Sequence, residues 1–501
     1  MLHDLINERL KKLSQLKESK VDPYPARVKR TVSIGEVRAS FRKLSQAKKK
    51  ISITGRVLGF RDQGNLLFCD LKDGSGALQV VLKKENLKNF ALLKKTLDRG
   101  DHLSASGALF KTKSGQESLV AKEASIIGKS LRPIPSEHFG IEEIETRLRK
   151  RYLDLLLNAE SKEIFKKKAV FWAAFREELN RAGFLEVETS VLEALPGGAE
   201  AEPFKTHHNA LDTDFFLRIS LELPLKKLLV AGYDKVFEIG RIFRNEGIDR
   251  EHLQDYTQLE FYWAYSDYAE LMKFTEKLYK VVIKKTAGSL TTAYLGQKIN
   301  WAKKWETIDY VQEFEKVNKI NPAKASKEEL FKKAENLGLK PEKNLGRGRL
   351  IDLIYKKTVR PKLIQPCFLI NPPVEIEPLA KRSEKNPAVV ERFQVMAGGT
   401  ELGKGFSELN DPLDQKKRFE EQMRLRAEGD KEAQILDEDF LEALEYGMPP
   451  AAGFGVSERL FAVLLDKPIR ETVIFPLMRP TLNVSLQELI HLNDDTKTKK
   501  K

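Results

Sequence analysis

The segment that decides the fold reads Val236-Phe-Glu-Ile-Gly-Arg-Ile-Phe-Arg-Asn-Glu-Gly247, and a charged loop joins it to Tyr256-Thr-Gln-Leu-Glu-Phe-Tyr262. Both halves alternate in character, which predicts an antiparallel hairpin with a charged tip. By the period of two, alternate residues of the second strand share one face: Tyr256, Gln258, Glu260 and Tyr262. Together with Arg244 and Glu246, this face suits a nucleotide and a small charged ligand. Taken alone, the segment fits a salt-bridged surface hairpin better.

Other motifs favour the binding interpretation. Phe243-Arg-Asn-Glu246 resembles the second signature motif of class II aminoacyl-tRNA synthetases, and Gly453-Phe-Gly-Val-Ser-Glu-Arg459 resembles the third. Gly183-Phe-Leu-Glu-Val-Glu-Thr189, behind a predicted helix, is similar to the first. Phe406-Ser-Glu-Leu-Asn-Asp411 and Pro196-Gly-Gly-Ala199 narrow the resemblance to the lysyl-tRNA synthetases of bacterial type within that class. The resemblance covers nearly the whole chain.

The resemblance implies how ATP is held. Arg244 would bridge the amino-acid carboxylate and the α-phosphate, and Arg459 would cover the face of adenine opposite Tyr256. The implied catalytic residues are Arg244, Arg459 and Glu401. The implied ATP-binding set is Arg244, Glu246, His252, Tyr256, Glu401 and Arg459.

The chemistry of lysine determines which side chains could recognise it. A long cationic side chain needs a deep slot that ends in carboxylates and a hydroxyl, and Glu260, Tyr262 and Glu408 supply them. The resemblance also implies that Gly198 and Glu222 hold the α-amino group. The implied lysine-binding set is Gly198, Glu222, Arg244, Glu260, Tyr262, Phe406 and Glu408.

The segment from Arg392 to Phe406 carries two adjacent glycines, which predict a tight turn between paired strands. In the family that it resembles, this hairpin supplies two acids that hold Mg²⁺ on the ATP phosphates. The matching positions are Gln394 and Glu401, with Glu408 or water as a helper. Because an amide is a poorer ligand for a hard cation than a carboxylate, we expect a weakened or rebuilt metal site. Lys404 also stands where the family has an asparagine beside the substrate.

Short β-rich runs separated by turn signals fill the region from Ile51 to Ile127, and they predict a five-stranded OB barrel. Such barrels bind single-stranded nucleic acid by stacking bases on aromatic rings. The resemblance implies that the barrel reads the tRNA anticodon through Phe68, Gln79 and a nearby glutamate, for which we take Glu117. By themselves, a buried Phe and a solvated Gln explain the first two positions better.

The predicted fold class is α+β with several domains, in which an OB-fold β-barrel precedes a class II catalytic domain with a mainly antiparallel sheet flanked by helices. A helix over Ser161 to Ala182 and the strand after it form the first motif, which the resemblance implies as a homodimer interface. The predicted order is an N-terminal helical extension (1–49), the OB-fold domain (50–130), a hinge (131–160), the catalytic domain (161–485) with a helical insertion at about 290–345, and a basic flexible tail (486–501).

Composition limits the alternatives. The net charge of +14 permits a polyanionic partner, although lysine-rich patches are more often solvated helix faces. The two cysteines, Cys69 and Cys367, form neither a disulfide framework nor a CxxC zinc motif, which favours a reducing compartment. No run is apolar enough for a signal peptide core or a membrane span, so a cytoplasmic location is predicted.

These features predict a lysine–tRNA ligase that uses ATP, L-lysine and Mg²⁺ and has tRNA(Lys) as its partner. The first alternative is an aspartyl- or asparaginyl-type enzyme of the same subclass, whose shorter substrates fit a deep acidic slot poorly. The second is a synthetase-like protein that binds tRNA or lysine with impaired activation, which the changes at Gln394 and Lys404 keep open.

Overall fold

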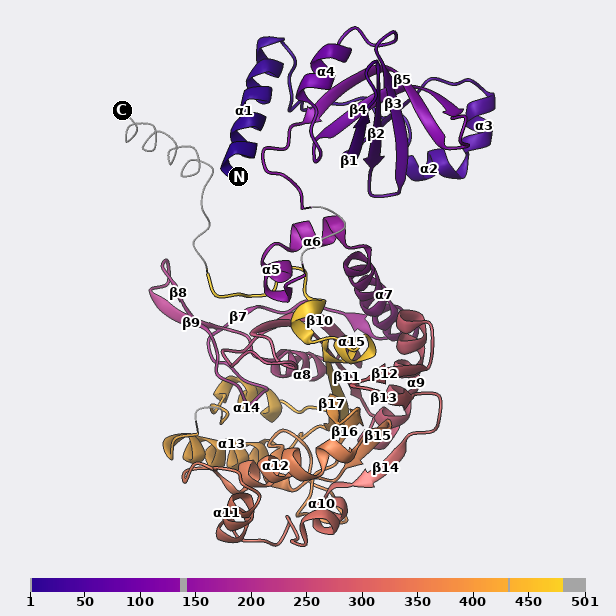
Figure 1. The fold of residues 1–501 in the computed structure, drawn as a ribbon. Helices are drawn as coiled ribbons and strands as arrows, with labels where there is room; N and C mark the ends of the chain where they lie inside the picture. The colour runs from indigo at the N-terminus through magenta and orange to yellow at the C-terminus, as the bar shows by residue number, and fades with distance from the viewer. Residues whose placement is uncertain (1, 136–141, 431–432, 481–501) are drawn as a thin grey trace. The chain divides into compact units, whose positions relative to one another are not determined.

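The computed structural model describes residues 2–135, 142–430 and 433–480 and divides into two compact units (Figure 1). Of the described residues, unit 1 comprises 2–135, 142–144, 479 and 480, and unit 2 comprises 145–430 and 433–478. Residues 145–160, predicted as part of the hinge, therefore belong to unit 2. The predicted basic tail at 486–501 lies outside the described residues. Within the described ranges, no helix has the length and apolar character that crossing a membrane requires.

Unit 1 is built around a closed barrel of five strands in the order β1-β2-β3-β5-β4, as predicted. A short helix, α4, lies between the third and fourth strands in sequence. The elements are α1 (Leu2–Glu18), α2 (Ile34–Ala39), α3 (Phe41–Gln46), β1 (Ile51–Asp62), β2 (Leu66–Lys72), β3 (Ala77–Lys83), α4 (Phe90–Thr96), β4 (His102–Lys111) and β5 (Glu117–Gly128).

The N-terminal helix α1 is fixed to the rest of unit 1 by a buried arginine, by an ion pair of Lys12 with Asp98, and by an apolar face. The Arg9 guanidinium is 8% exposed and donates hydrogen bonds to the backbone carbonyls of Arg99, Ser130 and Arg132. Ile6 and Leu16 are buried beside it. Because a buried guanidinium is costly unless its donors are satisfied, this anchor makes α1 an integral part of unit 1.

Unit 2 is organised by an eight-stranded sheet in the order β14-β15-β16-β17-β18-β11-β10-β6. Only the two outermost pairs, β14 with β15 and β10 with β6, are parallel, which confirms the predicted mainly antiparallel sheet. The strands are β6 (Leu185–Glu186), β10 (Lys235–Phe243), β11 (Asp255–Ala264), β14 (Glu306–Asp309), β15 (Cys367–Ile370), β16 (Arg392–Ala397), β17 (Thr400–Ser407) and β18 (Ala451–Ser457).

Helices cover both faces of this sheet. On one face, α7 (Ala159–Arg181) and α9 (Tyr268–Ala287) pack an aromatic core in which Phe171, Tyr279 and Phe454 are buried. On the other face, α8 (Glu222–Val230), α13 (Pro412–Ala427) and α14 (Glu438–Glu445) enclose a second core. The helix predicted over Ser161 to Ala182 is confirmed as α7.

The region at 290–345 differs from the predicted helical insertion. It begins with a hairpin, β12 (Thr291–Tyr294) and β13 (Gln297–Asn300), whose Tyr294 and Ile299 are buried in the aromatic core. Strand β14 then forms the edge of the main sheet, and only α10 (Tyr310–Asn318) and α11 (Lys327–Asn336) are helical. The prediction was wrong here because strands of four residues carry too little alternation to stand out in a lysine-rich segment.

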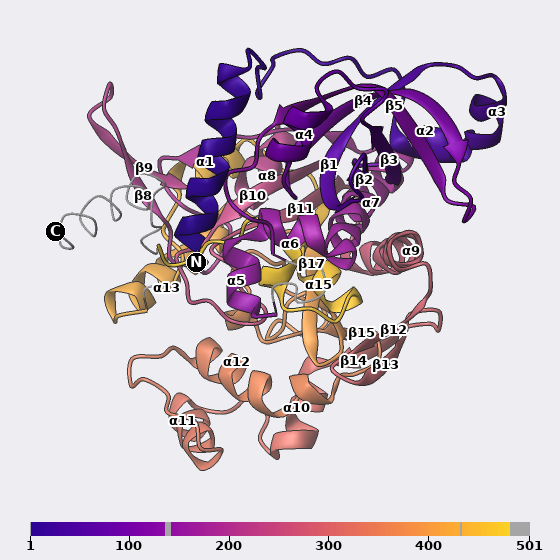
Figure 2. The same cartoon turned by 45° about the horizontal axis from the view of Figure 1, so that its top comes forward.

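The remaining elements of unit 2 are short. In both views α10, α11 and α12 gather at one end of the unit (Figures 1 and 2). The elements are α5 (Ile144–Arg149), α6 (Arg151–Leu157), α12 (Arg347–Thr358), α15 (Arg459–Leu464), three 3₁₀ turns at Arg360–Lys362, Val374–Ile376 and Ile469–Thr472, and a small sheet of β7 (Leu192–Glu193), β8 (Lys205–His208) and β9 (Thr213–Leu217) in the order β7-β9-β8.

Candidate active site

The hairpin of β10 and β11 forms the floor of the site. Its two strands pair antiparallel, with Phe237 opposite Phe261 and Glu238 opposite Glu260. Phe237, Leu259 and Phe261 face the aromatic core, so the alternate residues of β11 face the other way. The predicted antiparallel hairpin is therefore confirmed, and its polar face lines a cavity of about 920 Å³.

This cavity collects nearly all the residues that the sequence singled out within unit 2. Glu408 is 1% exposed and is not part of the lining, but its Oε1 lies directly behind Tyr262 and Gly453, which are. The predicted residues that line the cavity are Gly198, Glu222, Arg244, Glu246, His252, Tyr256, Glu260, Tyr262, Gln394, Glu401, Phe406 and Arg459.

One half of the cavity presents arginines without acidic partners. The Arg244 guanidinium lies 5.7 Å from the Tyr256 ring centroid, and its Nε donates to the Ile219 carbonyl at 3.2 Å. Arg459 donates to the carbonyls of Glu251 and Glu401, each at 3.3 Å. Across the described parts of the chain, neither guanidinium has a carboxylate within ion-pair distance, so both remain suited to an anionic ligand.

His252 and Glu246 lie in the same half of the cavity. The His252 Nδ1 is 2.7 Å from Asp249 Oδ2, and the Asp249 side chain also accepts from the backbone N–H groups of Glu251 and His252. These bonds order the charged tip of the hairpin. We name this half the nucleotide half, defined by Arg244, Glu246, His252, Tyr256 and Arg459.

The other half of the cavity, which we name the slot, ends at a buried group in which the carboxylates of Glu222 and Glu408 flank the ammonium of Lys226. The Lys226 ammonium lies 2.5 Å from Glu222 Oε1 and 2.5 Å from Glu408 Oε2. Burial raises the pKa of Glu222 to about 7, against the lowering influence of Lys226. Burial likewise raises the pKa of Glu408 well above its usual value. Burial disfavours the Lys226 ammonium too, but the two carboxylates outweigh it and raise the lysine pKa.

Glu260 has a supporting position in the slot. Its Oε1 accepts hydrogen bonds from Ser220 Oγ at 2.9 Å, the Leu221 backbone at 3.1 Å and Gln258 Nε2 at 2.6 Å. Its Oε2 accepts from the Tyr262 hydroxyl at 2.8 Å. Since four protein donors already occupy this carboxylate, Glu260 orients Tyr262 more than it contacts a substrate directly.

Two glycines make the slot sterically feasible. A Cβ at Gly453 would lie 2.3 Å from Glu408 Oε1 and 2.3 Å from Tyr262 Cε1. Gly198 adopts a φ of +79°, and a Cβ there would lie 3.0 Å from the Cβ atoms of Ser220 and Glu222. Any side chain at position 453 would push into the space where Glu408 and Tyr262 meet.

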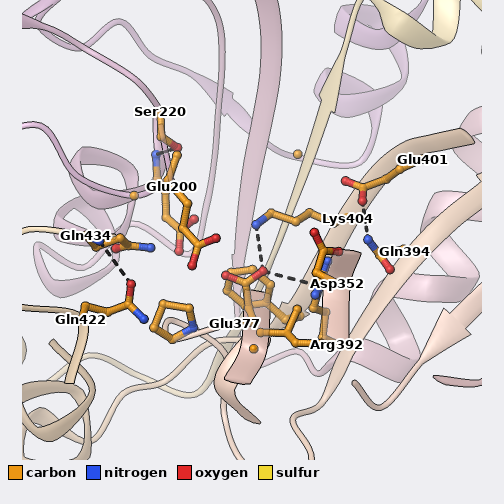
Figure 3. Close-up of a pocket in the computed structure, with 18 of the residues that line it drawn as sticks. Glu200, Ser220, Asp352, Glu377, Arg392, Gln394, Glu401, Lys404, Gln422 and Gln434 are labelled. Atoms are coloured by element: carbon orange, nitrogen blue, oxygen red, sulfur yellow. Dashed lines mark hydrogen bonds and ion pairs between the residues drawn. The ribbon is translucent and has the colours of Figure 1, made fainter. Parts of the chain in front are cut away.

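Lys404, which replaces an expected asparagine, does not fill the slot. Its ammonium donates to Glu377 Oε2 at 2.8 Å, and Figure 3 shows this side chain pointing toward Glu377. Arg392 Nε lies 3.5 Å from the same oxygen. Burial of Glu377 raises its pKa, but Lys404 and Arg392 outweigh burial, and the pKa lies below its usual value. The extra cation is thus neutralised inside the protein.

The predicted metal position contains a hydrogen bond in place of a pair of acids. The Gln394 side-chain amide donates to Glu401 Oε2 (Figure 3). Glu408, the predicted helper, is ion-paired with Lys226. Across the described ranges, no three or more His, Cys, Asp or Glu side chains group as a metal site. The donors fit a cation that Glu401 shares with ATP phosphates and water, but they do not fit one held between two protein carboxylates.

In unit 1, the predicted anticodon residues lie on adjacent strands of the barrel. Phe68 on β2 is half-buried, and the Arg61 guanidinium lies 5.9 Å from its ring centroid. Gln79 on β3 is 7% exposed and accepts a hydrogen bond from Ser118 Oγ at 3.0 Å. Glu117 begins β5, and its Oε1 is 3.8 Å from Lys111 Nζ. Because Asp70 pairs with Gln79, Phe68 and Gln79 share one face of the barrel.

Sequence reasoning missed the residues that balance charge within the site, namely Lys226, Glu377 and Arg392. Lys226 follows Glu222 by four positions on α8, and this spacing was the only local signal. Glu377 lies 27 residues before Lys404, directly after a 3₁₀ turn and in a segment with no recognisable motif. Glu200, whose pKa burial raises to about 7, was missed as well; its carboxylate is 3.1 Å from Arg349.

Comparisons with known proteins agree with this arrangement. Residues 143–479 match the family model described as tRNA synthetases class II (D, K and N), and residues 51–134 match the OB-fold nucleic acid binding domain. The chain is 42% identical over 483 residues to the lysine–tRNA ligase of Moorella thermoacetica, covering 95% of this chain and 98% of that protein.

Other relatives give the same result. The lysine–tRNA ligase of Carboxydothermus hydrogenoformans is 41% identical over 484 residues, covering 96% of this chain and 99% of the relative. The lysine–tRNA ligase of Fervidobacterium nodosum is 38% identical over 500 residues, covering 98% of this chain and 97% of that protein. With the hairpin floor, the paired acids of the slot and the barrel in place, the chain belongs to the lysine–tRNA ligase family of class II tRNA synthetases.

Proposed function

We propose that this chain activates L-lysine with ATP and transfers the lysyl group to the 3′ end of tRNA(Lys). One observation carries the proposal: Glu222, an acid of the slot, lines the same cavity as Arg244 and Arg459, which have no acidic partner among the residues that the structure describes. The slot suits an ammonium group, and the arginines suit a triphosphate. Aspartate or asparagine would be too short to reach the acids at the end of the slot.

In the first step, an oxygen of the lysine carboxylate attacks the α-phosphorus of ATP. A bond forms between that oxygen and phosphorus, and the bond from phosphorus to the leaving pyrophosphate breaks. Arg244 lies where it reduces the repulsion between the carboxylate and the phosphate. Most of the rate enhancement then comes from orientation and charge neutralisation, since no covalent protein intermediate is needed.

The nucleotide half orients ATP. Tyr256 offers one face for the adenine ring and Arg459 covers the other, while Glu246 accepts from the adenine amine. His252 reaches the outer phosphates. When bound, Mg²⁺ supplies positive charge to the leaving pyrophosphate, with Glu401 as its protein ligand. In the second step, a ribose hydroxyl of the terminal adenosine attacks the lysyl carbonyl carbon, and AMP leaves with the electron pair of the anhydride bond.

The slot selects lysine through its charge. Glu222 and the carbonyl of Gly198 serve the α-amino group, and Glu408 with Tyr262 serves the ε-ammonium. Glu408 Oε1 is buried and has no hydrogen-bond donor among the described residues, so a ligand donor there relieves an unmet requirement. Phe406 closes the wall of the slot.

Three further assignments extend the proposal. Phe68, Gln79 and Glu117 contact the anticodon, supported by the common face that the first two share. Two chains form a homodimer through α7 and β6, supported by the exposed apolar side chain of Leu185 on the edge strand β6. The protein works in the cytoplasm, supported by two buried free cysteines.

Amino-acid-dependent exchange of labelled pyrophosphate into ATP tests the proposal. We expect exchange with lysine and background rates with every other standard amino acid. Exchange driven by aspartate or asparagine would move the chain to the sister enzymes. Lysine binding without any exchange would favour a binding protein with impaired activation.

A further inference from the structure

The Lys226 side chain on α8 is fully buried, and its ammonium lies among charged and aromatic groups. Its side chain has no exposed surface, and its ammonium lies 2.5 Å from both Glu222 Oε1 and Glu408 Oε2. The rings of Phe406 and Phe440 close the remaining sides, with centroids 5.3 and 5.9 Å away. The ammonium is therefore bound by two acids of the substrate slot and two aromatic faces.

The two acids need such a cation. Two carboxylates taken out of water beside each other repel, and one would hold a proton at neutral pH unless a positive charge lay between them. Glu222 lies in the first turn of α8, and Glu408 directly follows β17. Because the two acids are distant in the sequence, their elements do not by themselves fix the distance between the two carboxylates. The Lys226 ammonium links the two elements and keeps each acid in a defined position.

Other charged groups near the slot do not take over this task. Glu260 is occupied by its four donors, one of which is Tyr262. Lys404 is committed to Glu377, and Arg392 lies beside the same carboxylate. Lys226 is thus the cation that directly contacts Glu222 and Glu408 within the part of the chain that the structure describes.

We propose that Lys226 is a positioning residue for lysine recognition: it acts as a built-in cation that holds Glu222 and Glu408 in place so that the second oxygen of each remains free for one ammonium group of the substrate. The inference rests on the proposed function and adds a specificity residue to it. Glu408 follows this scheme, since its Oε2 faces Lys226 and its Oε1 lacks a protein donor among the described residues.

A pH dependence follows. The pKa of Glu222 is about 7, so part of the empty protein carries a proton on this acid near neutrality. An incoming ammonium favours the ionised acid, and the affinity for lysine therefore rises as pH increases from about 6 to 8. Without Lys226 the pKa of Glu222 rises further, and the increase in affinity shifts to higher pH.

The test compares Lys226→Met, which keeps length and removes charge, with Lys226→Arg, which keeps charge. Lysine binding is measured by calorimetry, and the KM values for lysine and ATP come from pyrophosphate exchange between pH 6 and 8. We expect Lys226→Met to weaken lysine binding at pH 7 by about tenfold, to shift its pH profile upward, and to leave the KM for ATP within about twofold. Lys226→Arg should retain the profile of the unaltered protein.

A second comparison holds even where Lys226→Met fails to fold. The double variant Glu408→Gln/Lys226→Met removes an acid together with its cation, so it leaves less excess charge buried. If Lys226 acts through both acids, adding Lys226→Met to Glu408→Gln removes only the part of its effect that passes through Glu222, so it weakens lysine binding by clearly less than the roughly tenfold expected in the unaltered protein.

Several results would overturn the inference. One is a pH profile in Lys226→Met identical to that of the unaltered protein, and another is an equal loss of lysine and ATP affinity, as expected from general disruption. A loss of about tenfold or more on adding Lys226→Met to Glu408→Gln would also contradict it, because Lys226 would then act independently of Glu408. If the unaltered protein exchanges pyrophosphate with lysine, these results remove the role of Lys226 alone; if it fails to bind lysine, the proposed function falls as well.

Discussion

The two halves of the cavity treat charge in opposite ways. In the nucleotide half, the polar and ring contacts of the Arg244 and Arg459 guanidinium groups with described residues are to backbone carbonyls and one aromatic ring. In the slot, Glu222 and Glu408 are held by Lys226, and Glu377 is held by Lys404. The guanidinium charges of the first half remain available to a ligand. The carboxylate charges of the slot are largely neutralised by lysines of the protein itself.

The difference follows from the cost of burial. An arginine at an open cavity wall keeps contact with water, so its charge has only a small desolvation cost before phosphate binds. A carboxylate that is 1% exposed, as Glu408 is, cannot stay charged alone in a closed slot. A site for a small cation therefore has to carry its own cation as well as its acids.

The largest effect is expected from Arg244→Ala, which removes an uncommitted charge from the nucleotide half. Lysine-dependent pyrophosphate exchange should fall by about 10³-fold, because a preorganised donor is lost where negative charge gathers. Stability should change little, since no ion pair of Arg244 is broken. Steady-state kinetics and thermal unfolding measure the two quantities.

The matched control for this variant is Arg241→Ala on the same strand. Arg241 is ion-paired with Asp255 and does not line the cavity. Its loss should leave exchange within about twofold of the unaltered protein. Equal losses of exchange activity in the two variants would contradict the distinction between Arg241, which is ion-paired, and Arg244, which is left for the ligand.

A smaller effect is expected from Glu408→Gln in the slot. The KM for lysine should rise by about 10- to 100-fold, the range that one charged hydrogen bond represents, while the KM for ATP stays nearly constant. Glu421→Gln is the control, because Glu421 lines the cavity on α13 and pairs with Arg424. If Glu408→Gln raised both KM values together, the two halves would not be independent.

A change outside the cavity should spare both halves. Phe68→Ala in the barrel is expected to raise the KM for tRNA by about tenfold, since stacking of a base on an aromatic ring contributes about 1–3 kcal/mol. Pyrophosphate exchange without tRNA should be unchanged. Aminoacylation assays at varied tRNA concentration provide the measurement, and an unchanged KM would remove Phe68 from the anticodon surface.

The smallest effect is expected from Gln394→Glu, which would convert the amide beside Glu401 into a second acid. The Mg²⁺ concentration for half-maximal exchange should fall by about threefold, because a carboxylate is a better magnesium ligand than an amide. Gln297→Glu, at an exposed position of strand β13, makes the same chemical change away from the cavity. A magnesium dependence unaffected by Gln394→Glu would mean that Gln394 does not limit metal binding.

Features whose pattern lies within one short segment of the sequence could be predicted, whereas contacts between distant residues could not. The hairpin was predictable because alternation and the charged loop lie within one segment of chain, and the barrel was predictable from its turns. The same holds for the position of Gln394 beside Glu401, since both belong to one hairpin and are seven residues apart.

Long-range charge pairs could not be predicted in this way. The contact of Lys226 with Glu408 joins α8 to the residue after β17, and that of Lys404 with Glu377 joins β17 to the residue after a 3₁₀ turn. Neither pair has a spacing that a local pattern records. Glu260 shows the same limit, because its residue type suggested a ligand but its four hydrogen bonds depend on the folded slot.

The most direct measurement is to identify the aminoacyl-adenylate that the protein makes when ATP and the standard amino acids are supplied together at equal concentrations. Mass spectrometry of the protein-bound small molecules should find lysyl-adenylate alone. Aspartyl- or asparaginyl-adenylate, or no adenylate at all, would contradict the pairing of a triphosphate-binding half with a slot for a long cationic side chain.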